Sequence, residues 1–159
     1  MNKKKNRFIL LLLSMLLTGC SGKSATTIYS DNDKISSSSN SFNLDIENQA
    51  IDGEQISGSI NKMEGMDTIW TYESDEDKEL DITYLLNVGT GKFKLVLISP
   101  DNSITNIIER TNESEINDYA TNKIQIKQGF NRIKIVAGKK SSGEFDIKIP
   151  YGEFKELGM

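Results

Sequence analysis

From residue 42 onward, apolar side chains recur at every second position, and this feature most constrains the fold. The alternation is clearest over 80–88, where apolar side chains at even-numbered positions are separated by Asp81, Thr83 and Asn87. Shorter runs of the same kind cover 42–46, 56–60, 69–73, 93–97, 124–126, 133–135 and 145–151. A period of two places alternate side chains on opposite faces of an extended chain, so these runs predict half-buried β-strands.

The number and spacing of these runs indicate the fold class. With a further strand at 104–109, eight or nine short strands fall in about 110 residues, and no crossover helix separates them. We therefore predict an all-β fold: a single antiparallel β-sandwich, jelly-roll-like, with an immunoglobulin-like Greek key as the alternative. The three residues 89–91 are typical of a hairpin link, and Tyr84 and Tyr151 keep step with the expected core positions.

Two segments resemble small secreted jelly-roll modules that are appended to bacterial exoenzymes. The first is 95–101, a strand that ends in a turn containing Pro100, and the second is 129–135, in which a glycine starts a late strand. The resemblance implies a jelly roll and an accessory role, and it covers about a third of the domain.

The N-terminus carries a secretory signal pattern. Three lysines and Arg7 precede an apolar run over 8–17, which is interrupted only by Ser14. At about 1.5 Å per residue, the run reaches roughly 15 Å, about half of the hydrocarbon thickness, and is too short for a permanent transmembrane helix.

The residues after the apolar run specify the type of signal. Leu17-Thr18-Gly19-Cys20 resembles the lipobox of bacterial lipoproteins. The resemblance implies a signal peptide over 1–19, cleavage before Cys20, and a diacylglyceryl group on the Cys20 sulfur. Two acyl chains give stable tethering, whereas one gives only marginal binding. We therefore expect the protein at the cell membrane, lipid-anchored on the extracytoplasmic face.

Residues 20–41 predict a disordered, Ser-rich tether between this anchor and a domain over 42–159. The segment has few large apolar side chains and includes four consecutive serines at 36–39. Removing residues 1–19 takes away four of the 19 basic side chains, so 15 basic side chains face 23 acidic ones in the mature chain. An acidic surface of this kind argues against nucleic acid as a partner.

The composition excludes several catalytic chemistries. The chain has no His and one Cys, so His-based general bases, catalytic triads, thiolate metal clusters and intrachain disulfides are all excluded. We predict no cofactor and no catalytic residue. The expected role is a non-enzymatic binding or accessory module whose partner is an envelope protein or polymer; the alternatives are a surface carbohydrate-binding protein and a hydrolase that uses carboxylates.

Two sets of residues are candidates for ligand binding. Trp70, Tyr72, Tyr119 and Phe130 are the aromatic side chains that an exposed platform would use, and Tyr119 and Phe130 lie near expected loops. Asp75, Asp77 and Glu79 are weak candidates for a Ca²⁺ site, because they alternate in an acidic segment but do not fit the EF-hand pattern.

The basic residues are concentrated in the C-terminal quarter of the chain. Residues 20–120 hold 7 basic and 19 acidic side chains, and residues 121–159 hold 8 and 4. Five basic side chains alternate with apolar ones and are expected on outer faces: Lys123, Lys127, Arg132, Lys134 and Lys148. The favoured interpretation is cross-strand pairing with acidic neighbours, and the alternative is a basic patch for anionic lipid or wall polymer.

Overall fold

The computed structural model describes residues 28–114 and 118–159. The expected signal peptide and Cys20 lie outside the described residues. A 3₁₀ turn, η1 (Ile28–Ser30), and a short helix, α1 (Asn32–Ser36), are followed by eight strands. The strands are β1 (Ser41–Asp52), β2 (Gln55–Ser74), β3 (Lys78–Thr90), β4 (Lys92–Ile98), β5 (Ile104–Thr111), β6 (Ala120–Ile126), β7 (Gly129–Lys148) and β8 (Glu153–Phe154).

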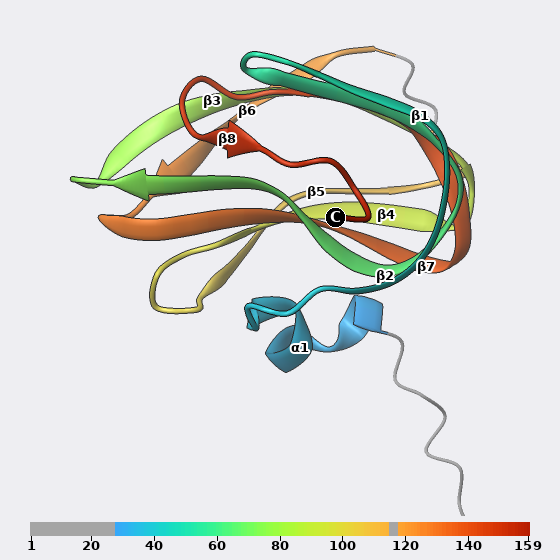
Figure 1. Cartoon of the computed structure of the whole chain (residues 1–159), viewed down its shortest axis with the longest axis horizontal. Coiled ribbons are helices and arrows are strands. Elements are labelled where there is room, and N and C mark those ends of the chain that lie inside the picture. The colour runs from blue at the N-terminus through green and yellow to red at the C-terminus, as the bar shows by residue number, and fades with distance from the viewer. Residues whose placement is uncertain (1–27, 115–117) are drawn as a thin grey trace, which may run out of the picture.

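The strands form two packed layers, and every strand pairing is antiparallel (Figure 1). The first sheet has the order β1, β2, β7, β3, β6. The second has the order β5, β4, β7, β2, β8. Both sheets contain β2 and β7, because each of these 20-residue strands bends and passes from one layer into the other.

The bend in β2 depends on local backbone geometry. The register between β2 and β7 shifts between Ile60 and Met63 and again before Gly65, and such irregularities bend a strand. Gly65 has φ +114°, and a Cβ there would lie 2.1 Å from the carbonyl oxygen of Ser41 in β1. Only glycine fits at this position, so the corner is fixed by the sequence.

This topology confirms the predicted jelly-roll-like sandwich. The β2–β7 pair spans both layers; β3 pairs with β6 in one layer and β4 pairs with β5 in the other. The expected hairpin at 89–91 is wrong: β3 and β4 do not pair with each other, and the link carries the chain from the first sheet to the second.

The core lies between the two sheets and is built by the predicted alternation. Ile82, Tyr84 and Leu86 of β3 face Phe93, Leu95 and Leu97 of β4 across one continuous buried cluster. Tyr151 does not join it. β7 ends at Lys148, Pro150 follows Ile149, and the Tyr151 side chain is 59% exposed.

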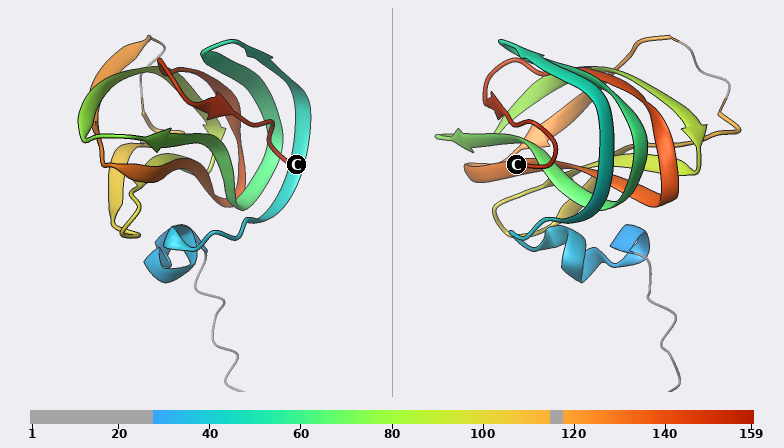
Figure 2. Two further views of the ribbon diagram at one scale, coloured as in Figure 1. Left: turned by 60° about the vertical axis from the view of Figure 1, so that its left-hand side comes forward. Right: turned by 45° about the vertical axis from the view of Figure 1, so that its right-hand side comes forward.

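Residues 28–40 differ from the expected tether. They cover the outer face of the second sheet, where Tyr29 and Ile35 pack on Met66, Val96 and Val136 (Figures 1 and 2). The folded unit therefore begins at or before Ile28, and not at residue 42. We call residues 28–40 the N-terminal strap.

Two basic side chains of β7 hold the strap in place. The Lys134 ammonium donates to the carbonyl oxygens of Ser37 at 2.9 Å and Ser39 at 2.7 Å. Arg132 donates to the carbonyl of Ser36 at 2.7 Å. Lys134 is fully buried, although the alternation places it on the outer face of its strand, because the strap covers that face.

Within the described residues, no helix has the length and apolar character needed to cross a membrane.

Candidate functional site

Aromatic side chains gather at one end of the sandwich, where β2, β7 and the turn before β8 meet. The Tyr72 ring of β2 stacks on Tyr151, with centroids 6.1 Å apart and an interplanar angle of 24°. Phe130 of β7 is 44% exposed and lines a hollow of about 350 Å³ together with Tyr72. We call Tyr72, Phe130 and Tyr151 the aromatic end.

A buried tryptophan fixes the backbone under this group. The Trp70 indole donates to the carbonyl oxygen of Tyr151 at 3.0 Å. The next residue, Gly152, has φ +74°, and a Cβ there would lie 2.6 Å from the indole. Tyr151 itself has φ +67°, which is an unusual conformation for a bulky side chain. The indole and the glycine together hold Tyr151 in this conformation with its ring toward solvent.

A cation lies above the same two tyrosine rings. The Lys78 ammonium is 5.8 Å from the Tyr72 centroid and 5.7 Å from the Tyr151 centroid, within the range of cation–π attraction. The nearby Tyr72 side chain and the Glu76 carboxylate raise the pKa of Lys78 above its ordinary value. The aromatic end is therefore a surface on which flat apolar faces and polar groups alternate.

The hollow beside the rings has a polar rim. It is lined by Thr71, Glu73, Gly152 and Glu153 in addition to Tyr72 and Phe130. Carboxylates accept hydrogen bonds from hydroxyl and amine groups. An aromatic floor with acceptors at its edge is suited to a ligand that carries both apolar faces and donors, such as a sugar ring.

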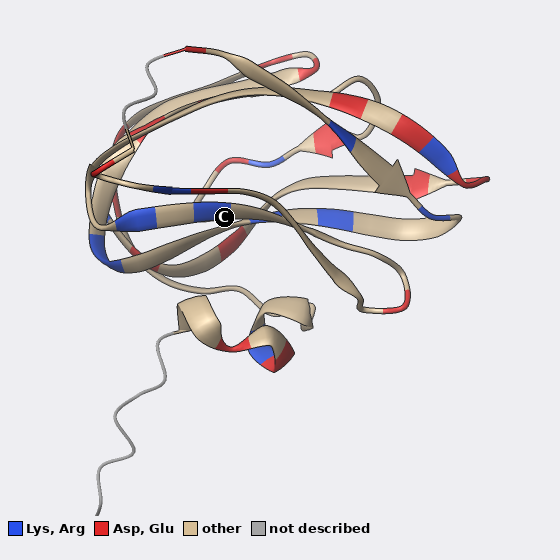
Figure 3. Cartoon of the chain, turned by 180° about the vertical axis from the view of Figure 1, so that it is seen from behind, with Lys and Arg blue, Asp and Glu red and all other residues tan. Residues whose placement is uncertain are grey.

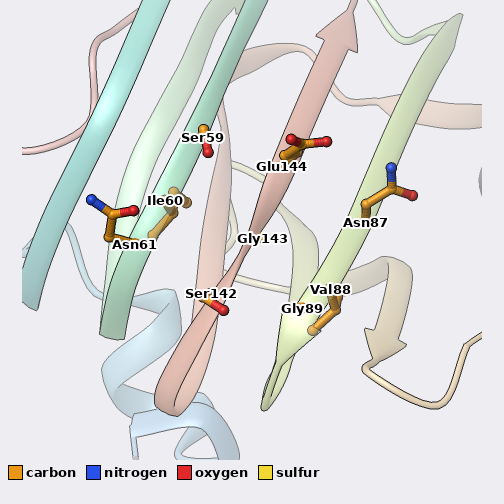
Figure 4. A pocket seen from close by; sticks show the side chains of 9 residues that line it. All are labelled: Ser59, Ile60, Asn61, Asn87, Val88, Gly89, Ser142, Gly143 and Glu144. Atoms are coloured by element: carbon orange, nitrogen blue, oxygen red, sulfur yellow. The ribbon is translucent and has the colours of Figure 1, made fainter.

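A second hollow of about 460 Å³ lies on the outer face of the first sheet (Figure 4). Ser59 of β2, Glu144 of β7 and Asn87 of β3 project into it from three adjacent strands. The Oδ1 atom of Asn87 is buried and has no hydrogen-bond partner among the described residues. The lining is polar and contains no aromatic side chain, so it offers hydrogen bonds but no stacking surface.

The structure brings together only part of the predicted aromatic set. Tyr72 and Phe130 line one hollow, and Trp70 lies behind them in the core, fully buried. Tyr119 is on a different surface, where its hydroxyl donates to Asp146 of the first sheet at 2.8 Å. Trp70 thus supports the backbone of this region and has no surface to offer a ligand.

The weak Ca²⁺ candidates do not form a site. Asp77 accepts from the backbone N–H of Gln128 at 2.7 Å, and Glu79 accepts from Lys123 and Gln125 across the β3–β6 pair. Among the residues that the structure describes, no group of three or more acidic or sulfur side chains is arranged to hold a metal ion. The acidic segment instead uses its carboxylates to join neighbouring strands and turns.

The five alternating basic side chains do not form one patch. Lys123 of β6 pairs with Glu79 of β3, as cross-strand pairing predicts, whereas Lys127 pairs with Asp101 at 2.7 Å between the turn after β6 and the turn after β4. These two lysines lie near acids on exposed surface, whereas the strap covers Arg132 and Lys134. The predicted cross-strand pairing is confirmed for Lys123, and Lys127 also pairs with an acidic neighbour, but from a turn.

Sequence reasoning missed Tyr151 and Lys78 as members of the aromatic end. Tyr151 continues the alternation of Phe145, Ile147 and Ile149, which placed it in the core. The signal that argued otherwise is Pro150-Tyr151-Gly152, because proline and glycine on either side of a residue are typical of a turn.

No protein-family model and no curated protein sequence matches the chain. Several solved structures resemble it in fold. One is the pre-peptidase C-terminal domain of a collagenase from Bacillus anthracis, which is 14% identical with a TM-score of 0.39 and matches 69% of this chain and 88% of that one.

Two carbohydrate-binding modules show similar likeness. A family 35 module from an environmental isolate is 18% identical, with a TM-score of 0.36, over 76% of this chain and 90% of the module. A structure described as CBM4 is 10% identical, with a TM-score of 0.35, over 70% of this chain and 78% of that one. At these identities and TM-scores, the likenesses carry no inference about what this chain binds.

Proposed function

We propose that the chain is a lipid-anchored extracytoplasmic lipoprotein whose jelly roll is a non-enzymatic binding module of the cell envelope. The Leu17-Thr18-Gly19-Cys20 motif supports the anchor. The aromatic end supports the binding role. Its ligand is a glycan of the envelope, bound by stacking of sugar rings on Tyr72 and Tyr151.

The conformation of Tyr151 is the observation that carries the binding role. A non-glycine residue in the left-handed region costs of order 1–3 kcal/mol, and such strain gathers at ligand sites. Tyr151 is 59% exposed, so burial of its ring does little to offset that cost. The Trp70 hydrogen bond and the stack on Tyr72 keep the ring in place, which reduces the entropy that a ligand must remove on binding.

The polar rim selects the class of glycan. Glu73 and Glu153 line the hollow next to the rings, and Glu54 accepts from the backbone N–H of Tyr151 at 3.3 Å. Carboxylates repel anionic polymers and accept from hydroxyl groups. Because the Lys78 cation lies over the same two rings, a neutral glycan fits this site better than a phosphate-bearing polymer or a glycan with free amines.

Affinity electrophoresis of the chain in gels that contain purified neutral envelope glycan tests the binding role. We expect Tyr151→Ala to weaken binding by about tenfold or more, which corresponds to about 1.4 kcal/mol. The matched control is Tyr119→Ala, because Tyr119 is similarly exposed, at 55%, but lies on another surface. Equal retardation of both variants and the wild type in these gels refutes glycan binding at the aromatic end.

The anchor is tested separately by the Cys20→Ser variant. We expect wild-type protein in the membrane fraction with a mass that includes a diacylglyceryl group, and the variant unprocessed or released. A wild-type chain with an unmodified Cys20 sulfur rules out the anchor but leaves the glycan experiment unaffected.

A further inference from the structure

Lysines gather at the corner where β7 turns from the second sheet to the first. Lys92 and Lys94 lie on the outer face of β4, and Lys139 and Lys140 occupy the bend of β7. We call these four residues the basic corner. In Figure 3, basic segments are visible at the left-hand end of the sandwich, where the strands bend from one layer into the other.

Contacts between these elements hold the corner together. Lys92 and Lys139 line one hollow of about 320 Å³. A Cβ at Gly138 would lie 2.9 Å from the Lys92 side chain, so the two strands approach closely there. The Thr90 hydroxyl donates to the carbonyl oxygen of Lys140 at 3.0 Å, which joins the end of β3 to the bend of β7.

The start of the strap lies at this corner. The ammonium groups of Lys92 and Lys94 are 4.2 and 4.7 Å from the centroid of the Tyr29 ring. The Tyr29 hydroxyl donates to Glu109 at 2.7 Å. These contacts place the backbone at Ile28, the first described residue, beside the basic corner.

The charges at the corner favour an anionic surface. Among the described residues, none of the four lysines has a carboxylate within ion-pair distance. Lys139 and Lys140 are exposed. Among the residues that the structure describes, the acids of this region are Glu109, which Tyr29 engages, and Glu113, which lines the same hollow as Lys92. Positive charge is therefore in excess here, although the mature chain as a whole is acidic.

The length of chain before Ile28 brings the corner close to the membrane if Cys20 is lipidated, a condition that rests on the proposed function. Ile28 is eight positions after Cys20 in the sequence. A fully extended chain of that length spans at most about 29 Å, and a flexible one averages roughly 16 Å. Because the strap is folded, only the residues before Ile28 set the distance between Cys20 and the domain, and not the whole of 20–41.

We infer that the basic corner rests against anionic lipid headgroups, so that the domain stands on the membrane with this corner inward and the aromatic end free. Lysines near an anionic leaflet are attracted within about a Debye length, about 8–10 Å. Four lysines alone bind an anionic membrane weakly. The covalent anchor keeps them at high effective concentration near the membrane, so the lipid and the lysines act together as two attachment signals.

Amine footprinting of the purified lipoprotein in vesicles tests this orientation. The vesicles contain either phosphatidylcholine alone or phosphatidylcholine with phosphatidylglycerol, and an acylating reagent modifies exposed lysines. We expect acylation of Lys139 and Lys140 to fall several-fold in the anionic vesicles relative to the neutral ones. Lys148 and Lys155, which are exposed on other parts of the domain, serve as internal controls and keep the same reactivity.

Paired charge-reversal variants make the test specific. In the double variant Lys139→Glu/Lys140→Glu, we expect protection of Lys92 by anionic vesicles to disappear, whereas Lys148→Glu/Lys155→Glu leaves it intact. Equal acylation of the corner in both kinds of vesicle overturns the proposal. A flotation assay detects failure of the anchor separately, because wild-type protein without the lipid does not float with neutral vesicles. In that case, the same footprinting experiment is carried out on chains whose Cys20 thiol is coupled to a maleimide lipid.

Discussion

The buried ammonium of Lys134 makes the stability of this protein depend on pH in an unusual direction. Burial and the nearby Arg132 lower the pKa of Lys134 from 10.5 to about 8, with a smaller opposing contribution from Asp67. The unfolded chain therefore holds this proton more tightly than the native chain. Between pH 8 and pH 10.5 the unfolded state binds more protons, so stability rises as the pH increases.

The size of the effect follows from the two pKa values. For a folded pKa of about 8 and an unfolded pKa of 10.5, a change from pH 7.5 to pH 9.5 raises the free energy of unfolding by about 2 kcal/mol. One could expect the opposite pH dependence, in which the Lys134 ammonium stabilises the strap through the carbonyls of Ser37 and Ser39 only while it is charged, so that stability falls as the pH rises. A neutral amine still donates hydrogen bonds and no longer carries the cost of a buried charge.

Urea unfolding at the two pH values, followed by the fluorescence of the single tryptophan, measures this change. The Lys134→Met variant is the reference, because it lacks the titrating group and retains a side chain of similar length. We expect the wild type to gain about 2 kcal/mol more than the variant between pH 7.5 and 9.5. Equal pH dependence in the two proteins, or a wild type that loses stability as the pH rises, contradicts this account of the buried lysine.

Three further substitutions test the contributions of the strap, of the turn at Gly152 and of an exposed ion pair to stability. Ile35→Ala removes a fully buried side chain from the strap and is expected to lower the free energy of unfolding in urea by about 2 kcal/mol or more; an unchanged value shows that the strap contributes nothing to the native fold. Gly152→Ala places a Cβ against the Trp70 indole and is expected to shift the urea midpoint further than Gly53→Ala, which has a similar positive φ but no atom within 4 Å; equal shifts leave only backbone strain as the cause. Glu79→Gln breaks an exposed ion pair between β3 and β6, and exposed pairs contribute little to stability, so its thermal midpoint should match that of the wild type within error. A clearly lower thermal midpoint contradicts this expectation.

The alternation of apolar and polar side chains predicts most of the fold. It identifies at least part of every strand except β8, because a half-buried sheet needs one apolar face whatever its neighbours are. It does not show that the runs at 56–60 and 69–73 belong to one strand. The polar and glycine-containing segment between them, 61–65, reads as a loop, and only the packing of two layers shows that it is a bend with a register shift.

The aromatic end was predicted in part. Tyr72 and Phe130 are recognisable as candidates because large aromatic side chains near strand ends are typical of binding surfaces. Tyr151 was not, because its conformation depends on a hydrogen bond to Trp70, which lies 81 positions away in the chain. Contacts over such separations leave no local pattern.

The strand-forming runs and the motif at Cys20 can be read from the sequence, because each depends on near neighbours in the chain, whereas the bend at Gly65 cannot. Which outer face of the sandwich is covered depends on contacts between residues far apart in the chain, and these contacts exist only in the folded protein. The strap is polar and rich in serine, so its composition resembles that of a tether. The strap folds because Ile35 and Tyr29 pack on apolar side chains of the second sheet. In addition, Lys134 and Arg132 donate hydrogen bonds to strap carbonyl groups, which water would otherwise hydrate.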